Sequence, residues 1–170
     1  PVGADDAAPA VEAGGTFNGT PGIDPSGNLL ANDTDVDIAT NGDVLHLTSV
    51  TSILGTTITI ADNDDSSTEH AIAGSFGTLY VRANGAARYV VDNDNPLVQS
   101  KRLAGDTLTE TFTYTLADAA NAAAAGSSTL TITIQGANDT PVARDDAGTA
   151  IEAGGLENGT PGNPATANLL

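Results

Sequence analysis

The residues of this chain best suited to chemistry are carboxylates at alternating positions. The segment Asn-Asp-Thr-Asp-Val-Asp places Asp33, Asp35 and Asp37 two residues apart. In a tight loop this spacing can direct several oxygens at one cation, and Ca²⁺ takes about six to eight oxygen ligands. The segment is not an EF-hand, because Ile38 stands where that loop requires Gly. A solvated acidic turn is the alternative interpretation.

A second group of oxygen ligands lies near residue 140. Asn138 and Asp139 follow an alternating apolar run and precede Asp145 and Asp146. Acid and amide side chains at this spacing are suited to clamping Ca²⁺. The alternative is a turn marked by Pro141 and capped by polar side chains.

Glu110 is a carboxylate at an inward position of a predicted strand. It alternates with Leu108 and Phe112, and burying a bare charge is very costly. Glu110 is therefore predicted to coordinate a metal or to form a salt bridge with one of the five basic residues. Glu12 and Glu152, each in a Glu-Ala-Gly-Gly sequence, are weaker candidates for metal ligands than Glu110.

The charge of the chain excludes several classes of partner. Five basic and 22 acidic residues give a net charge of −17. Nucleic acid is not expected as a partner, because binding it requires Lys and Arg to neutralise phosphates. Membrane insertion is not expected either, since no apolar run approaches the length of a membrane span. Bound cations would offset the repulsion among the acidic groups.

The sequence gives little support to catalysis. It has no Cys, only His46 and His70, and no Ser in a nucleophile-elbow pattern. A carboxylate pair can serve a glycosidase, but such enzymes usually need aromatic sugar platforms, and the chain has only three Tyr and three Phe. The chain is therefore predicted not to be an enzyme.

A long repeat defines the domain organisation. Residues 1–30 return as residues 141–170, and 18 of the 30 positions are identical. A period of this length indicates whole domains arranged head to tail. We predict one complete unit at 1–140, with a strand core at about 44–136, and the start of the next unit at 141–170.

The complete unit is predicted to be an all-β sandwich of about seven strands with Greek-key links. Residues 1–43 are rich in Gly, Pro, Asn and Asp and predict a loop-rich segment with one short strand near 10–13. Asn84-Gly85 predicts a hairpin with positive φ at both residues. The predicted strands cover 44–51, 56–60, 69–73, 78–82, 87–91, 108–116 and 129–134. The predicted core is Leu45, Leu47, Ile58, Ile60, Leu79, Val81, Tyr89, Val91, Leu103, Phe112, Tyr114, Leu116, Leu130, Ile132 and Ile134.

Four stretches resemble VCBS repeats and related cadherin-like, bacterial immunoglobulin-like modules of large RTX-type surface adhesins. They are NLLANDTDVD (28–37), FGTLYVRANGAARYVVDNDNPLVQS and the residues to Leu103 (76–103), GDTLTETFTYTLAD (105–118) and LTITIQGANDTP (130–141). The resemblance implies a bacterial surface protein exported by type I secretion. Its repeats would be Ca²⁺-rigidified extenders or modules for cell adhesion and biofilm formation.

The resemblance also implies where the ions lie. A ligand set between units would contain Glu12, Glu110, Asn138 and Asp139, together with Asp145 and Asp146 of the next unit. Asp33, Asp35 and Asp37 would face the preceding unit. The sequence departs from the family pattern in two places. Six residues, Ile-Ala-Thr-Asn-Gly-Asp, follow Asp37 in place of a direct Gly-Asp, and the second copy stops before its own Asn-Asp-x-Asp element.

The partners expected from these observations are neighbouring repeats of the same chain and host or surface glycans or proteins. The first hypothesis is a calcium-binding structural repeat. The alternative is an adhesion domain that binds a glycan or another surface ligand directly. Such a domain should expose an aromatic cluster or a deep polar pocket.

Overall fold

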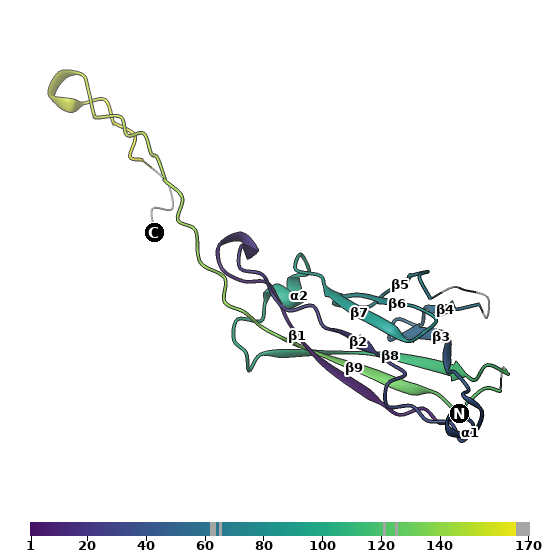
Figure 1. The fold of residues 1–170 in the computed structure, drawn as a ribbon. Helices are drawn as coiled ribbons and strands as arrows, with labels where there is room; N and C mark the ends of the chain where they lie inside the picture. Colours follow the sequence, from purple (N-terminus) through teal and green to yellow (C-terminus); the bar gives the residue numbers. More distant parts are fainter. Residues whose placement is uncertain (62–63, 65, 121, 125, 166–170) are drawn as a thin grey trace. The chain divides into compact units, whose positions relative to one another are not determined.

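The computed structural model describes residues 1–61, 64, 66–120, 122–124 and 126–165. The chain divides into two compact units, Pro1–Thr140 and Pro141–Leu170 (Figure 1). Each unit is described by itself below. No helix in the described residues is long and apolar enough to span a membrane.

The first unit contains the seven predicted strands. They are β3 (His46–Ser52), β4 (Thr57–Thr59), β5 (His70–Ala73), β6 (Gly77–Val81), β7 (Ala86–Val91), β8 (Thr107–Ala117) and β9 (Ser128–Gln135). Successive side chains of a strand point to opposite sides of the sheet. Along the whole of β9, buried and partly exposed residues alternate accordingly. The prediction of seven strands between residues 44 and 136 is confirmed.

Two further strands come from the N-terminal segment. β1 (Asp6–Val11) pairs in parallel with β9, and β2 (Ser26–Asn28) pairs antiparallel with β7. The prediction of one short strand near 10–13 was therefore wrong in position and number. The segment is rich in turn-forming residues, and β1 forms because β9, more than 110 residues further along the chain, offers it a sheet edge.

The strands form a sandwich of two sheets (Figure 1). The larger sheet has the order β1-β9-β8-β3-β4, and the smaller sheet has the order β2-β7-β6-β5. The β1–β9 pair is parallel, and the other neighbouring strands are antiparallel. The predicted all-β immunoglobulin- or cadherin-like sandwich is confirmed.

The core lies between the two sheets and is close to the predicted one. Tyr89, Phe112 and Tyr114 are the largest fully buried side chains. Ile58 is only partly buried. Leu103 was wrongly placed in the core, because it is 65% exposed. Its carbonyl accepts a turn hydrogen bond from the amide of Asp106, so it precedes β8 in a turn outside the sheet.

The hairpin predicted at Asn84-Gly85 is partly confirmed. Asn84 and Gly85 form the β6–β7 hairpin turn, but only Gly85 has a positive φ, 83°. A helical turn, α2 (Pro96–Gln99), follows β7 and is capped by the Asn95 side chain, which accepts a hydrogen bond from the amide of Leu97. The short helix α1 (Ile38–Asn41) was not predicted.

The repeated sequence forms the same loop in each unit. In the first unit, η1 (Thr16–Asn18) is closed by bridges between residues 14 and 20 and between 11 and 23. In the second unit, η2 (Leu156–Asn158) is closed by bridges at the equivalent positions, 154 with 160 and 151 with 163. The Glu-Ala-Gly-Gly-x-x-Asn-Gly sequence therefore specifies this loop locally, without the sheets that surround it in the first unit.

Candidate metal sites

The first candidate site lies where β1 and β9 end, at the end of the sandwich that carries η1 and α2 (Figure 1). The parallel pairing of the two strands continues past their ends as a ladder of backbone hydrogen bonds. The amide of Glu12 donates to the Gln135 carbonyl at 3.0 Å, and the amide of Gly15 donates to the Asn138 carbonyl at 2.9 Å. This ladder brings Glu12 beside Asp139, although 126 residues separate them in the sequence.

Glu12 and Asp139 leave two buried carboxylate oxygens without a partner. Glu12 is only 1% exposed, and its Oε1 accepts a hydrogen bond of 2.8 Å from the amide of Ala137. Among the described residues, neither Glu12 Oε2 nor Asp139 Oδ1 has a hydrogen-bond partner. Burial raises the pKa of Glu12, the Ala137 amide opposes this rise, and the charge of Asp139 adds to it. This arrangement favours a cation or a proton at the pair.

Asn93 supports this end of the unit from the β7–α2 connection. Its Oδ1 accepts a hydrogen bond of 2.7 Å from the amide of Ala13, and its carbonyl accepts one from the Asn18 side chain. Asn138 was predicted as a side-chain ligand, but its backbone carbonyl is already bonded to Gly15 and the residue is exposed. Asn93 was not predicted, because only the fold brings it to the chain after β1.

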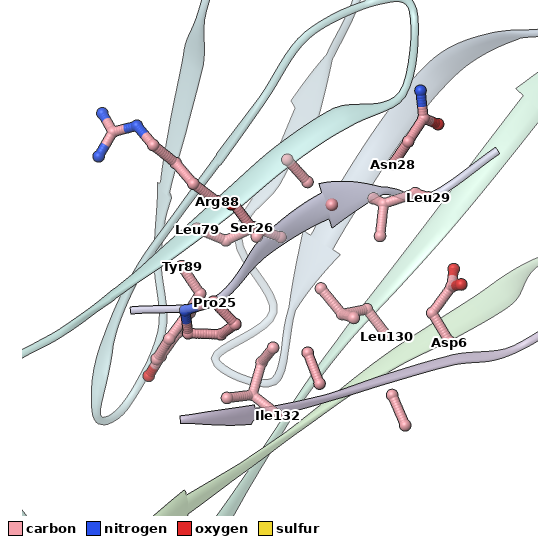
Figure 2. A pocket seen from close by; sticks show the side chains of 14 residues that line it. Asp6, Pro25, Ser26, Asn28, Leu29, Leu79, Arg88, Tyr89, Leu130 and Ile132 are labelled. Carbon is pink, nitrogen blue, oxygen red and sulfur yellow. The ribbon is translucent and has the colours of Figure 1, made fainter. Parts of the chain in front are cut away.

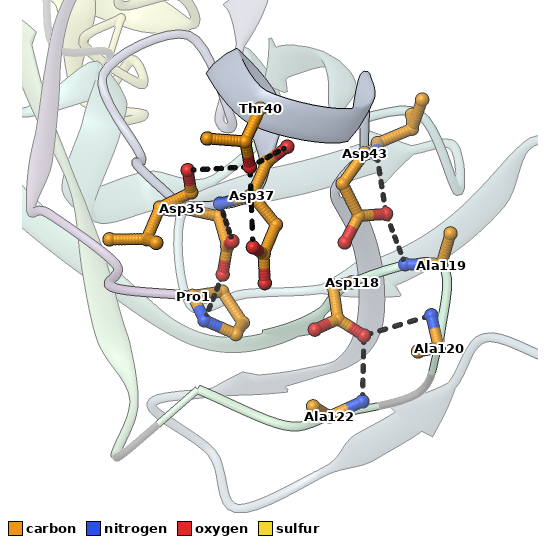
Figure 3. A network of polar contacts seen from close by, with 11 residues as sticks. Pro1, Asp35, Asp37, Thr40, Asp43, Asp118, Ala119, Ala120 and Ala122 are labelled. Carbon is orange, nitrogen blue, oxygen red and sulfur yellow. Dashed lines mark hydrogen bonds and ion pairs between the residues drawn. The ribbon is translucent and has the colours of Figure 1, made fainter.

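The second candidate site lies at the opposite end of the sandwich, beside the N-terminus and α1. Carboxylate oxygens of Asp35, Asp37 and Asp43 lie within 4.8 Å of one another (Figure 3). Asp35 Oδ1 accepts a hydrogen bond of 2.7 Å from the amide of Asp37, and its other oxygen pairs with the Pro1 amine. The Pro1 amine and the Asp37 amide lower the pKa of Asp35, so it carries a full negative charge at neutral pH.

Asp43 and Asp118 belong to this end but were not predicted as ligands. Asp43 Oδ1 accepts a hydrogen bond of 3.1 Å from the amide of Ala119, and Asp118 Oδ1 accepts bonds from Ala120 and Ala122. Figure 3 shows the carboxylates of Asp37, Asp43 and Asp118 facing one another. Two features of the sequence could have identified these two residues as candidate ligands. Asp43 ends the extra segment after Asp37, and Asp118 directly follows a strand.

Asp33 does not join its alternating neighbours. It is 8% exposed and faces inward, where its Oδ1 accepts a hydrogen bond of 2.7 Å from the amide of Ala4. Burial raises its pKa, and the charge of Asp6 raises it further. The Tyr114 hydroxyl lies 2.8 Å from Asp6 Oδ2 and has a raised pKa, chiefly from burial. The predicted set 33, 35 and 37 is thus split between the interior and the end of the unit.

Glu110 is inside the sandwich, as its alternation predicted, but its partners are neither metal-ligand candidates nor basic residues. It is 1% exposed. Its oxygens accept hydrogen bonds from the amides of Ser75 and Phe76, in the β5–β6 turn, and from the hydroxyl of Tyr89 on β7. Burial, followed by the bond to Glu110, raises the pKa of Tyr89. Both carboxylate oxygens are therefore already used within the fold.

Asp145 and Asp146 lie in the second unit, where both are exposed. Their counterparts in the first copy show what these positions do in a complete unit. Asp5 Oδ1 accepts a hydrogen bond of 2.8 Å from the amide of Thr129, and Asp6 accepts one from Tyr114. The first copy therefore uses this Asp pair to hold β1 against the larger sheet.

A pocket between the β1 and β2 edges offers little for catalysis (Figure 2). Its volume is about 190 Å³, below the range of about 300–1,000 Å³ of most ligand pockets. Its charged groups, Asp6 and Arg88, are bonded to Tyr114 and to Glu69 respectively. Arg88 also covers the ring of Tyr80, at 3.7 Å from the ring centroid, so this ring is not a free stacking platform.

The fold and the sites define a class of protein, a β-sandwich repeat with acidic groups at both ends. Residues 1–136 match the family model of the bacterial cadherin-like domain. A search of curated proteins found no match. The chain belongs to the bacterial cadherin-like domain family. Domains of this family are typically structural, non-enzymatic modules found in extracellular surface proteins, and the family indicates an adhesion or extender module.

Proposed function

We propose that the complete unit is a calcium-binding extender repeat of a large bacterial surface adhesin of the RTX type. It would be exported by type I secretion and would act in cell adhesion or biofilm formation. One observation carries the calcium part of this proposal. Glu12 Oε2 and Asp139 Oδ1 are both buried without a partner in the described chain, and the charge of Asp139 acts on the Glu12 carboxylate. Carboxylate oxygens are the ligands that Ca²⁺ prefers.

The positions of the carboxylates favour a mechanical role for the ions. Glu12 and Asp139 lie at one end of the sandwich, and Asp35, Asp37 and Asp43 lie at the other end. A cation at the first end would connect the chain after β1 to the chain after β9. A cation at the second end would connect the 33–43 segment to the end of β8. The bound ions would also reduce the repulsion within a chain of net charge −17.

Calcium titration of chelator-stripped protein by calorimetry tests the proposal. The Glu12→Gln variant should bind Ca²⁺ at least about tenfold more weakly at this site, since it loses a charged ligand. The Glu152→Gln variant is the matched control, because Glu152 stands in the same Glu-Ala-Gly-Gly sequence but is exposed. Equal calcium binding by the Glu12→Gln variant and the wild type would contradict the proposal.

A second readout separates loss of a ligand from general damage. Burial and the Asp139 charge raise the pKa of Glu12, so its negative charge costs stability when no cation is bound. The Glu12→Gln variant should therefore melt at the wild-type temperature or higher in chelator, and lower than wild type in millimolar Ca²⁺. A misfolded variant would melt lower in both conditions.

A further inference from the structure

The outer face of the larger sheet is covered by threonine. Every odd position from Thr107 to Thr115 on β8, and from Thr129 to Thr133 on β9, is threonine and lies on this face. The strand register places these residues side by side, Thr109 opposite Thr133 and Thr111 opposite Thr131. We refer to the outer surface of β1, β9, β8, β3 and β4 as the threonine face.

The threonine face carries no carboxylate, lysine or arginine side chain in any of its five strands, all of which the structure describes, and His46 at the start of β3 is the single titratable residue on it. Their two carboxylates point into the sandwich, where Asp6 bonds to Tyr114 and Glu110 bonds to Tyr89. The outer face of the smaller sheet differs, since Glu69 there pairs with Arg88 at 2.8 Å. A chain of net charge −17 thus keeps one broad surface free of carboxylate, lysine and arginine side chains.

We propose that the threonine face is a self-association surface, and that its partner is the same face of a second copy of this chain. Electrostatics favours this partner. Two copies repel each other wherever their carboxylates meet, and the repulsion is smallest where both surfaces are uncharged. A two-fold axis brings identical faces together.

Hydroxyl groups make this face complementary to itself. Each threonine hydroxyl has one donor hydrogen and two acceptor lone pairs, so two identical rows can exchange hydrogen bonds. Hydroxyls already bond to one another within the face, Thr51 to Thr57 at 2.9 Å and Ser49 to Thr115 at 2.6 Å. The threonine methyl groups supply apolar area, and twisted sheets pack face to face at roughly 10 Å when aligned.

The size of the face sets the expected strength. Neighbouring strands about 4.8 Å apart, paired over six residues (β1–β9), eight (β9–β8), six (β8–β3) and three (β3–β4) that rise about 3.4 Å each, cover roughly 400 Å² per copy. A stable complex usually buries about 800 Å² per partner, so the contact belongs among weak, transient interfaces. Weak contacts of this kind become effective when many copies lie side by side.

Sedimentation equilibrium of the 170-residue chain up to about 1 mM tests the proposal. In chelator, the average mass should rise with concentration, and it should rise more at about 1 M salt, where the Debye length falls to roughly 3 Å and the net charge is screened. Association must persist without Ca²⁺, because the face holds no ligand. A mass that stays monomeric in all conditions, or that rises only with Ca²⁺, would overturn the proposal and leave the calcium proposal untouched.

Charge-reversal pairs separate a specific contact from a net-charge effect. Thr131→Glu and Thr131→Lys should each weaken association at least about tenfold, because either change brings like charges together across the two-fold axis. Thr78→Glu and Thr78→Lys, on the outer face of the smaller sheet, should have little effect. If Glu weakens association while Lys strengthens it at both positions, net charge alone is responsible and the proposal fails. Circular dichroism melts confirm folding, and the same pair at Thr111 replaces any Thr131 variant that unfolds.

Discussion

Replacing Glu110 with alanine should destabilise the first unit strongly, and equally with and without calcium. Glu110 is 1% exposed and accepts hydrogen bonds from two backbone amides and one hydroxyl. The alanine variant leaves these donors without an acceptor, which costs about 1–3 kcal/mol for the buried Tyr89 hydroxyl and less for the half-buried amides of Ser75 and Phe76, and it also leaves a cavity. These costs do not simply add, because the groups share one network, and together with the cavity they give an expected loss of about 3–5 kcal/mol in the free energy of unfolding.

A thermal melt followed by circular dichroism measures this loss. For a domain of this size, 1 kcal/mol corresponds to roughly 2–4 °C, so the melting temperature should fall by about 10 °C. Thr109→Ala, at the neighbouring exposed position of the same strand, is the control and should change the free energy by no more than about 0.5 kcal/mol. Tyr89→Phe removes only the hydroxyl donor and should cost less than Glu110→Ala.

Calcium decides between two roles for Glu110. If its carboxylate is held only by Ser75, Phe76 and Tyr89, the rise in melting temperature on adding Ca²⁺ is the same in the Glu110→Ala variant as in the wild type. If Glu110 is a metal ligand, as the cadherin resemblance implied, that rise disappears. A variant that melts within about 2 °C of wild type in chelator would refute the hydrogen-bond network as a source of stability.

Three further predictions concern the metal, the pH and the backbone. Millimolar Ca²⁺ should raise the melting temperature, by the equivalent of about 2.7 kcal/mol at a hundredfold excess over Kd. Mg²⁺ should do much less, because it holds its own waters; equal effects of the two ions would point to simple screening. In chelator, the free energy of unfolding should increase as the pH is lowered from 7 toward about 4.5, because the folded state raises the pKa of Glu12 and Asp33 and so binds more protons than the unfolded state. Ca²⁺ should reduce this gain at Glu12, and denaturant titrations at each pH measure it; a free energy that falls over this range contradicts the assignment. Gly22→Ala should destabilise the unit by about 1–3 kcal/mol, because a Cβ there meets the carbonyl of Val11, whereas Gly27→Ala meets nothing within 4 Å and should be neutral in the same denaturant assay.

The sequence alone predicted the strands that carry their own pattern. Strict alternation in β8 and β9 identified both strands and placed Phe112, Tyr114 and Ile132 in the core. The repeated η1 and η2 loops have the same conformation in both units, which shows that this segment is encoded locally. These features follow from periodicity and turn chemistry, which act over a few residues.

Tertiary structure decided the features that depend on distant partners. β1 was not predicted in its correct place, because its parallel pairing needs β9 from the other end of the unit. The same pairing places Glu12 beside Asp139. Alternation correctly put Glu110 inside, but only the packing of the two sheets supplied Tyr89 and the β5–β6 turn as its partners. Sequence spacing shows which residue types are available, whereas burial and hydrogen bonding across the sandwich determine which oxygens remain free to bind an ion.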